Sequence, residues 1–207
     1  MPSFLQIYQT ADDQAHDAAA EDPFPAYLEG VDTSLAPFCP TSATRVLKAL
    51  RMGRVGTDDR LVDLGSGDGR FVTAAVSEYG CRSALGIESD QDLVALSRHL
   101  ADQVFGGEHS DHGVRFEQGD LLSTLKLANT CSGGGDIQED DVLPWTVIVL
   151  FLLPDHSDRF ADDILQLHQR GARIISLVFN LDEIKGLTLQ QADEQDGIFV
   201  YSKSPLV

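Results

Sequence analysis

Residues 61–70, LVDLGSGDGR, combine a carboxylate with a glycine-rich turn. An apolar run leads to Asp63, and glycines follow at alternate positions, Gly65, Gly67 and Gly69. Glycine permits a tight turn, lets a ligand approach the backbone without a Cβ in the way, and suits close packing where a helix starts. In an open α/β sheet, ligands bind beyond the carboxyl ends of the strands. The spacing therefore predicts a cofactor site at this strand end.

The charge of this turn separates two classes of cofactor. A dinucleotide-binding turn has the pattern GxGxxG and seats a pyrophosphate on a helix N-terminus. Here the pattern is GxGxG, and the carboxylates of Asp63 and Asp68 would repel a pyrophosphate. The same two carboxylates would attract the α-amino group and the sulfonium charge of S-adenosylmethionine. We therefore expect S-adenosylmethionine as the cofactor, bound in this turn by Asp63, Gly65, Ser66 and Gly67.

Two further acids follow the next predicted strands. Glu88 ends the strand 83–88 and can accept hydrogen bonds from both ribose hydroxyls, since a carboxylate offers two acceptor oxygens. Asp120 ends the segment 114–120 and can accept a hydrogen bond from the adenine amino group, while the Leu121 amide can donate to a ring nitrogen. The competing interpretations are a solvated loop acid for Glu88 and a helix N-cap for Asp120. We expect all three residues to bind the cofactor.

The strongest predicted strand, 145–151, leads toward the reacting end of the site. It is apolar on both faces, as a central parallel strand should be, and it continues through Phe151 to Pro154 and Asp155. We expect Phe151 and Pro154 to line a dry substrate channel beside the transferable methyl group. Asp155 is a candidate for orienting an amine, although capping of the next helix is the interpretation that its position favours.

Histidines and cysteines form no metal pattern in this chain. His109 and His112 have HxxH spacing, but they lie in a predicted loop without a third ligand. Cys39, Cys81 and Cys131 are too few and too scattered for a zinc site or a disulfide framework. We expect no metal and free thiols.

The elements that must position these residues alternate between strand and helix. Apolar periodicity predicts β-α-β units followed by a C-terminal hairpin. The expected strands are 60–64, 83–88, one within 114–120, 145–151 and 172–179, the expected helices are 41–51, 71–79, 93–104 and 160–167, and the hairpin covers 187–204. This order predicts a doubly wound α/β fold of the Rossmann-like type, with a mostly parallel seven-stranded sheet and an antiparallel C-terminal hairpin.

The chain divides into an N-terminal extension, 1–40, and a main domain, 41–207. The extension is partly loop, with a short helix over roughly 3–20 whose Ala and Asp content predicts a weak apolar face. Two segments of the main domain, 106–113 and 128–141, are rich in glycine and acids and are predicted to be flexible surface insertions.

Composition and charge exclude some classes of binding partner and some cellular locations. The chain has 15 basic and 33 acidic side chains, a net charge of −18, which repels phosphate backbones and disfavours nucleic acid. Hydrophobic residues make up 43%, as in a folded globular protein, and no apolar run is long enough to span a bilayer. The first basic residue is Arg45, so the N-terminal region lacks the charge of a secretory or mitochondrial signal. We expect a cytoplasmic protein, with a nuclear location as the alternative.

Two levels of family resemblance rest on these motifs. Asp63 through Gly69, with Glu88 and Asp120, resembles the pattern of class I S-adenosylmethionine-dependent methyltransferases, over roughly residues 38–204. The segment PFCPTSATRVLKAL (37–50) followed by LVDLGSGDGR resembles a narrower group, the protein-lysine methyltransferases of the ATP synthase c-subunit and the adenine nucleotide translocase. That resemblance implies that Pro40 and Thr41 belong to the cofactor site, and that the acceptor is a lysine-bearing protein.

The leading hypothesis is therefore methyl transfer from S-adenosylmethionine to a protein lysine. Two alternatives stay open, a methyltransferase with a small-molecule acceptor on the same fold and a non-catalytic cofactor-binding protein, because a fold does not fix a substrate. An NAD-dependent enzyme is a more distant alternative, which a binding titration with NADH would distinguish.

Overall fold

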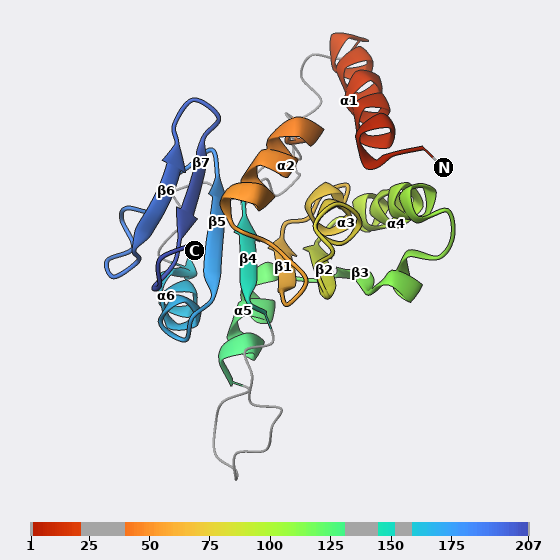
Figure 1. Ribbon diagram of the computed structural model, residues 1–207. Coiled ribbons are helices and arrows are strands. Elements are labelled where there is room, and N and C mark those ends of the chain that lie inside the picture. Colours follow the sequence, from red (N-terminus) through yellow and green to blue (C-terminus); the bar gives the residue numbers. More distant parts are fainter. Residues whose placement is uncertain (1, 22–39, 131–144, 152–158, 207) are drawn as a thin grey trace, which may run out of the picture.

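The computed structural model describes residues 2–21, 40–130, 145–151 and 159–206 (Figure 1). Within these ranges, a seven-stranded sheet has the order β3-β2-β1-β4-β5-β7-β6. The strands are β1 Arg60–Leu64, β2 Ser83–Glu88, β3 Val114–Gln118, β4 Val147–Leu150, β5 Arg173–Leu177, β6 Leu189–Asp193 and β7 Ile198–Tyr201. The helices are α1 Phe4–Glu21, α2 Ala43–Met52, α3 Arg70–Ser77, α4 Gln91–Phe105, the short 3-10 helix η1 His109–His112, α5 Leu121–Thr130 and α6 Ala161–Gln169.

Strands β1 to β5 run parallel to one another, whereas β7 is antiparallel to both β5 and β6. The predicted mostly parallel sheet with an antiparallel C-terminal hairpin is therefore confirmed. Because the strands are parallel, the carboxyl ends of β1, β2, β3 and β4 lie along one edge of the sheet, which is where the predicted site residues follow them.

The central strands of the sheet are buried on both faces. Along β1, Leu61 belongs to one hydrophobic core and its neighbour Val62 to the other, and along β4 Val149 and Ile148 divide in the same way. Successive side chains of a strand point to opposite faces, so a strand that is apolar throughout requires two covering layers. Residues of α1, α2, α3 and α4 complete the first core, and residues of α5 and α6 complete the second.

Helix α1 packs more firmly than the sequence predicts. Phe4, Ile7 and Tyr8 are buried in the first core, and α1 contacts α2, α3 and α4. The expected weak apolar face is therefore wrong for the first half of the helix. The division of the chain into an extension and a domain at residue 40 stays a prediction.

The segment 106–113 is also better anchored than predicted. It contains η1, and Asp102 Oδ1 accepts a hydrogen bond from the backbone amide of the buried His109 at 2.9 Å and lies 2.8 Å from its Nδ1. Of the second predicted insertion, residues 128–130 end α5 and the rest lie outside the described residues. None of the described helices is long and apolar enough to cross a membrane.

Candidate functional site

The glycine turn follows β1 and is fixed by hydrogen bonds to the end of β2. The amides of Gly65 and Ser66 both donate to the Ile87 carbonyl, over 2.9 and 3.0 Å. Gly65, Gly67 and Gly69 have φ values of 87°, 53° and 78°, a region that strongly favours glycine. The alternate glycines are thus required by the backbone path of the turn.

Packing explains two of the turn's small residues. A Cβ on Gly69 would lie 2.5 Å from the Phe116 ring and 2.7 Å from Ser97 Cβ, so the close packing predicted at the helix start is confirmed. The Ser66 hydroxyl is buried against Gly86 of β2, where an added Cβ would approach it to 2.6 Å. The structure gives the Ser66 side chain a packing role, and its predicted cofactor contact stays a prediction.

Asp63 is the most unusual charge in the site. Its side chain is buried, and within the described ranges no hydrogen-bond donor contacts its carboxylate. Burial raises the pKa of Asp63 well above its usual value, and the negative charges of Glu88 and Asp68 raise it further. A buried, uncompensated carboxylate costs free energy until a cation pairs with it. This position is therefore suited to a positively charged ligand group.

Glu88 lies at the end of β2, and its side chain is hydrogen-bonded to the glycine turn. One of its carboxylate oxygens accepts a hydrogen bond from the Gly67 amide at 2.9 Å. The other accepts from the amides of Ser89 and Asp90, at 2.7 and 3.0 Å. The alternative of a merely solvated loop acid is therefore wrong, because Glu88 connects two strand ends. Its contact with ribose stays a prediction.

Asp68 does not act as sequence analysis proposed. Arg70 Nε donates to Asp68 Oδ1 at 2.8 Å, and Arg70 Nη2 donates to Asp68 Oδ2 at 2.5 Å. Both side chains are buried, so this bidentate pair compensates the carboxylate charge. The expectation that Asp68 attracts a cationic cofactor together with Asp63 is wrong. The argument against a pyrophosphate rests instead on Asp63 and Glu88.

The segment that precedes α2 meets the turn through the same arginine. Thr41 is buried, and its carbonyl accepts a hydrogen bond from Arg70 Nη1. Pro40 is half-buried directly before it. The structure thus brings both residues next to the glycine turn, although they precede it by more than 20 positions.

Asp120 caps α5. Its carboxylate accepts hydrogen bonds from the Ser123 amide at 2.9 Å and from the Ser123 hydroxyl at 2.8 Å. Partial burial opposes the shift, but these hydrogen bonds lower the pKa of Asp120 below its usual value. The N-cap interpretation is confirmed, Leu121 is buried as the first residue of the helix, and the predicted adenine contacts of both residues stay predictions.

The acceptor side of the site is described only up to Phe151. Leu64 of β1 lies beside Leu150 of β4, so the half-buried Phe151 follows β4 next to the start of the glycine turn. Phe151 also packs against the first core. Pro154 and Asp155 lie outside the described residues.

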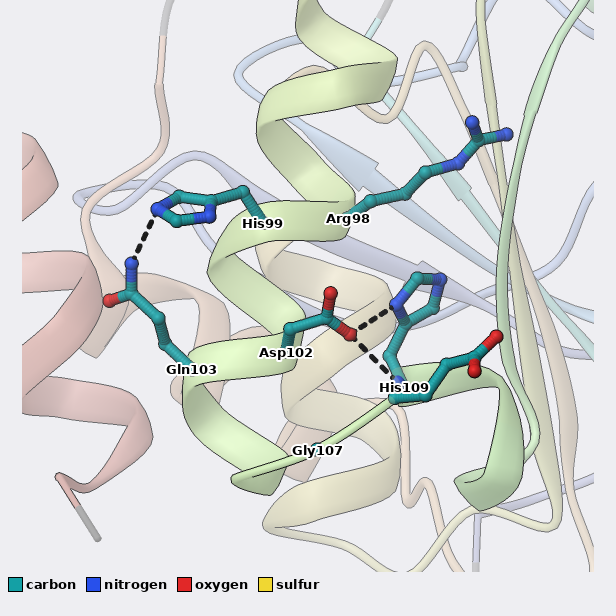
Figure 2. Close-up of a pocket in the computed structure, with 7 residues that line it drawn as sticks. Arg98, His99, Asp102, Gln103, Gly107 and His109 are labelled. Atoms are coloured by element: carbon teal, nitrogen blue, oxygen red, sulfur yellow. Dashed lines mark hydrogen bonds and ion pairs between the residues drawn. The ribbon is translucent and has the colours of Figure 1, made fainter.

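A cavity of about 600 Å³ lies between the C-terminal half of α4 and the segment that follows this helix (Figure 2). It is lined by Arg98, His99, Asp102, Gln103, Gly107, Glu108 and His109. Figure 2 shows that its side chains pair with one another: Asp102 Oδ1 lies 2.8 Å from His109 Nδ1, and Gln103 Nε2 lies 2.7 Å from His99 Nε2. Among the described residues, no group of three or more His, Cys, Asp or Glu side chains is placed to hold a metal. The cavity shares no residue with the glycine turn.

Comparison with known proteins identifies the family. A sequence model described as the ANTKMT methyltransferase domain matches residues 63–188, from the acid that precedes the glycines to the residue before β6. The chain belongs to the ANTKMT methyltransferase domain family. The resemblance that the glycine turn, Glu88 and Asp120 carry is thereby confirmed.

Individual relatives agree with the family. A protein-lysine N-methyltransferase of Saccharolobus islandicus is 26% identical over 152 residues, which are 72% of this chain and 79% of the relative. The adenine nucleotide translocase lysine N-methyltransferase of Mus musculus is 45% identical over 62 residues, 30% of this chain and 26% of the relative. The crystal structure of an RNA methyltransferase from Salinibacter ruber, in complex with S-adenosyl-L-homocysteine, has a TM-score of 0.59 at 27% identity and covers 81% of this chain and 97% of that one.

This member of the ANTKMT methyltransferase domain family is an S-adenosylmethionine-dependent methyltransferase with a Rossmann-like fold. The geometry of its turn fits that cofactor in two respects. Asp63 is a buried carboxylate with no counter-charge among the described residues, which suits a cationic amino group. A Cβ on Gly65 would meet none of the described residues within 4 Å, so a ligand can approach the backbone there.

Three residues beside the turn were not expected from the sequence. Arg70 binds Asp68, Asp12 of α1 accepts a hydrogen bond from Arg70, and the Tyr8 hydroxyl of α1 donates to the Asp68 carbonyl. Arg70 directly follows the turn, so its position in the sequence could have indicated it. Tyr8 and Asp12 are about 60 positions away, and no pattern in a single sequence indicates that they lie beside the turn.

Proposed function

We propose that this methyltransferase acts on a lysine amine of a protein. The observation that carries the proposal is that both curated relatives described above are named as lysine N-methyltransferases. One of them matches this chain over most of its length, so the likeness is not confined to the cofactor turn.

In this proposal, the cofactor lies across the carboxyl ends of β1, β2 and β3. Asp63 pairs with its amino group, Glu88 accepts from its ribose, and the start of α5 contacts its adenine. The other contacts come from the turn and from the segment before α2, so that the full set is Pro40, Thr41, Asp63, Gly65, Ser66, Gly67, Glu88, Asp120 and Leu121. When bound, S-adenosylmethionine supplies a methyl group on a positively charged sulfur and leaves as a neutral thioether.

The chain's own task at the acceptor is to present a neutral amine in line with that methyl group. Phe151 follows β4 beside the turn, and its half-buried ring offers apolar surface for the lysine side chain. Removal of an ammonium from water lowers its pKa, which frees the nitrogen lone pair that forms the new bond. The displaced proton passes to solvent, so this step requires no strong general base. Pro154 and Asp155 stay proposed contributors to the same channel.

Charge supports a basic protein as the partner. The net charge of the chain is −18, and exposed acids surround the carboxyl edge: Asp90 and Asp92 follow β2, and Glu117 and Asp120 lie at the end of β3. Such a surface attracts a lysine-rich segment and raises its rate of association. The same surface repels an RNA backbone, which disfavours the acceptor class of the Salinibacter ruber structure.

The proposal is tested with S-adenosylmethionine labelled on its methyl group. The purified chain is incubated with cell extract, and the products are divided and treated with protease or with ribonuclease. We expect label that protease releases, that ribonuclease leaves intact, and that acid hydrolysis converts to methylated lysine. Label in ribonuclease-sensitive material, or only in molecules that pass a small-molecule filter, would contradict the lysine assignment.

The matched control uses a carboxylate outside the proposed site. Asp63→Asn should remove the labelling, because the amino group of the cofactor loses its counter-charge. Asp58→Asn, an exposed acid before β1, should label the extract as well as the unaltered chain does.

A further inference from the structure

Arg70 joins three separate segments of the chain beside the glycine turn. Its guanidinium binds both carboxylate oxygens of Asp68 in the turn, at 2.8 and 2.5 Å, and the carbonyl of Thr41 before α2. Its Nη1 also donates to Asp12 Oδ1 of α1 at 2.7 Å. The side chain is only 4% exposed. The planar guanidinium, with five donors in a fixed arrangement, suits such a junction, whereas lysine does not.

Tyr8 contributes a second connection from α1 to the same place. Its hydroxyl lies 3.3 Å from the Asp68 carbonyl, which is part of the turn's backbone, and 3.1 Å from Thr73 Oγ1 in α3. Its ring lies under the Arg70 guanidinium, 5.4 Å from Cζ to the ring centroid, a cation–π arrangement. Tyr8 is fully buried, so these contacts are shielded from water.

Asp12 contacts a second segment through its other carboxylate oxygen. Its Oδ2 accepts a hydrogen bond from the Ala43 amide, at 3.4 Å. Ala43 is the first residue of α2, and the N-cap Ser42 makes no side-chain cap bond, so Asp12 supplies an acceptor for one of the amides at the start of the helix that have no partner within it. Asp12 therefore contacts both Arg70 and the helix that follows Pro40 and Thr41.

We propose that Tyr8 and Asp12 are positioning residues for the cofactor: through Arg70, helix α1 holds the glycine turn and Thr41 in the geometry that binds S-adenosylmethionine. Arg70 is the residue that hydrogen-bonds both Asp68 and Thr41, which lie on different segments, so the arginine fixes the position of one relative to the other. The inference depends on cofactor use and is independent of the acceptor.

The proposal is tested by the affinity of S-adenosylhomocysteine, measured by isothermal titration calorimetry. Asp12→Ala removes the acceptor for Arg70 and Ala43 and should weaken binding about tenfold, the effect of one hydrogen bond to a charged group. Asp12→Asn keeps an uncharged acceptor and should lie between Asp12→Ala and the unaltered chain. Asp13→Ala is the matched control, because Asp13 is the exposed neighbour on the same helix, and its affinity should change less than about twofold.

A purely structural role predicts a different result. Asp12→Ala would then lower the melting temperature but leave the affinity unchanged at temperatures at which the variant is folded, and this outcome would overturn the proposal. Equal weakening by Asp12→Ala and Asp13→Ala would also overturn it. Tyr8→Phe keeps the buried ring and removes only the hydroxyl, so it should weaken binding about threefold, and unchanged affinity there would argue against the Tyr8 contact.

Coupling between two sites is reciprocal, which gives an independent measurement. If α1 holds the turn, S-adenosylhomocysteine must in turn stabilise the docking of α1. Hydrogen exchange of the α1 amides should slow in the unaltered chain when the ligand is added, and the slowing should be smaller in Asp12→Ala. Exchange of α1 that does not respond to the ligand would contradict the coupling.

Discussion

Asp63 carries a cost in the cofactor-free protein that a cationic ligand removes. Its carboxylate is buried beside Glu88 and near Asp68, and no donor among the described residues compensates it. Arg70 neutralises Asp68 and leaves Asp63 with its charge unpaired. At the scale of single residues, the site therefore favours ligand binding over the stability of the empty protein, as functional sites often do.

The raised pKa of Asp63 predicts a dependence of stability on pH. A carboxyl whose pKa is higher in the folded than in the unfolded chain contributes stability that is fully present below its ordinary pKa and is lost as the pH rises through the folded value. Asp63→Asn should therefore raise the free energy of unfolding of the cofactor-free protein, with a gain that grows over this pH range. Urea titrations at several pH values measure it, and a gain that shrinks toward neutral pH would contradict the assigned shift.

Val178 is a second strained residue at the carboxyl edge. It follows β5 with φ = 68°, and its amide donates to the Gly197 carbonyl at 2.7 Å. A side chain with a branched Cβ is disfavoured in this region by about 1–2 kcal/mol. Val178→Gly should raise the free energy of unfolding by about 1 kcal/mol, since the side chain is 38% exposed and loses little packing. In urea titrations, Val178→Ala keeps the Cβ and should show no such gain, and destabilisation by the glycine variant would contradict the account.

The sequence predicts those site residues whose role follows from their neighbours in the chain. Asp63 ends an apolar strand, and the glycines need their positive φ, so both features are local. The pairing of Asp68 with Arg70 is close in sequence, but the direction in which a turn residue points is set by tertiary packing. Tyr8 and Asp12 reach the turn through the docking of a helix, which no local pattern encodes.

At the scale of elements, the apolar character of α1 averaged over the whole helix does not reveal that its first half is buried in the core. Phe4, Ile7, Tyr8 and Ala11 have the spacing of a buried stripe, and the Phe4 and Tyr8 rings lie 4.7 Å apart. The second half of the helix holds acids, which lower the mean hydropathy of the whole helix, and alanines, whose apolar surface is small, and it leads to the incorrect expectation of a weak apolar face. The central strands β1, β4 and β5 were easier to predict, because burial on both faces makes each of them a nearly continuous apolar run.

Docking of α1 on the first core predicts a measurable loss of stability on truncation of its anchor. Phe4 is 1% exposed, so Phe4→Ala should lower the free energy of unfolding by about 3 kcal/mol in urea titrations. Gln9→Ala, an exposed position of the same helix, should change it by less than about 0.5 kcal/mol. Equal stability of Phe4→Ala and the unaltered chain would show that α1 is an undocked extension.

At the scale of the whole molecule, the sheet brings four strand ends to one edge and so assembles a site from residues 40 to 151. Alternation of strand and helix was enough to predict this fold class, because neighbouring parallel strands need a helical crossover between them. The acceptor could not be predicted from the order of strands and helices, because enzymes with different substrates share this fold and this cofactor turn. Net charge and the named relatives are what favour a protein lysine.

The most direct test of the account is a calorimetric titration of the unaltered chain and of Asp63→Ala with S-adenosylmethionine and, separately, with NADH. The account predicts one bound S-adenosylmethionine per chain, no binding of NADH, and a loss of affinity of at least about tenfold in Asp63→Ala, the effect of one lost contact to a charged group. Binding of NADH, or unchanged affinity for S-adenosylmethionine in Asp63→Ala, would contradict the role assigned to the glycine turn and its buried carboxylate.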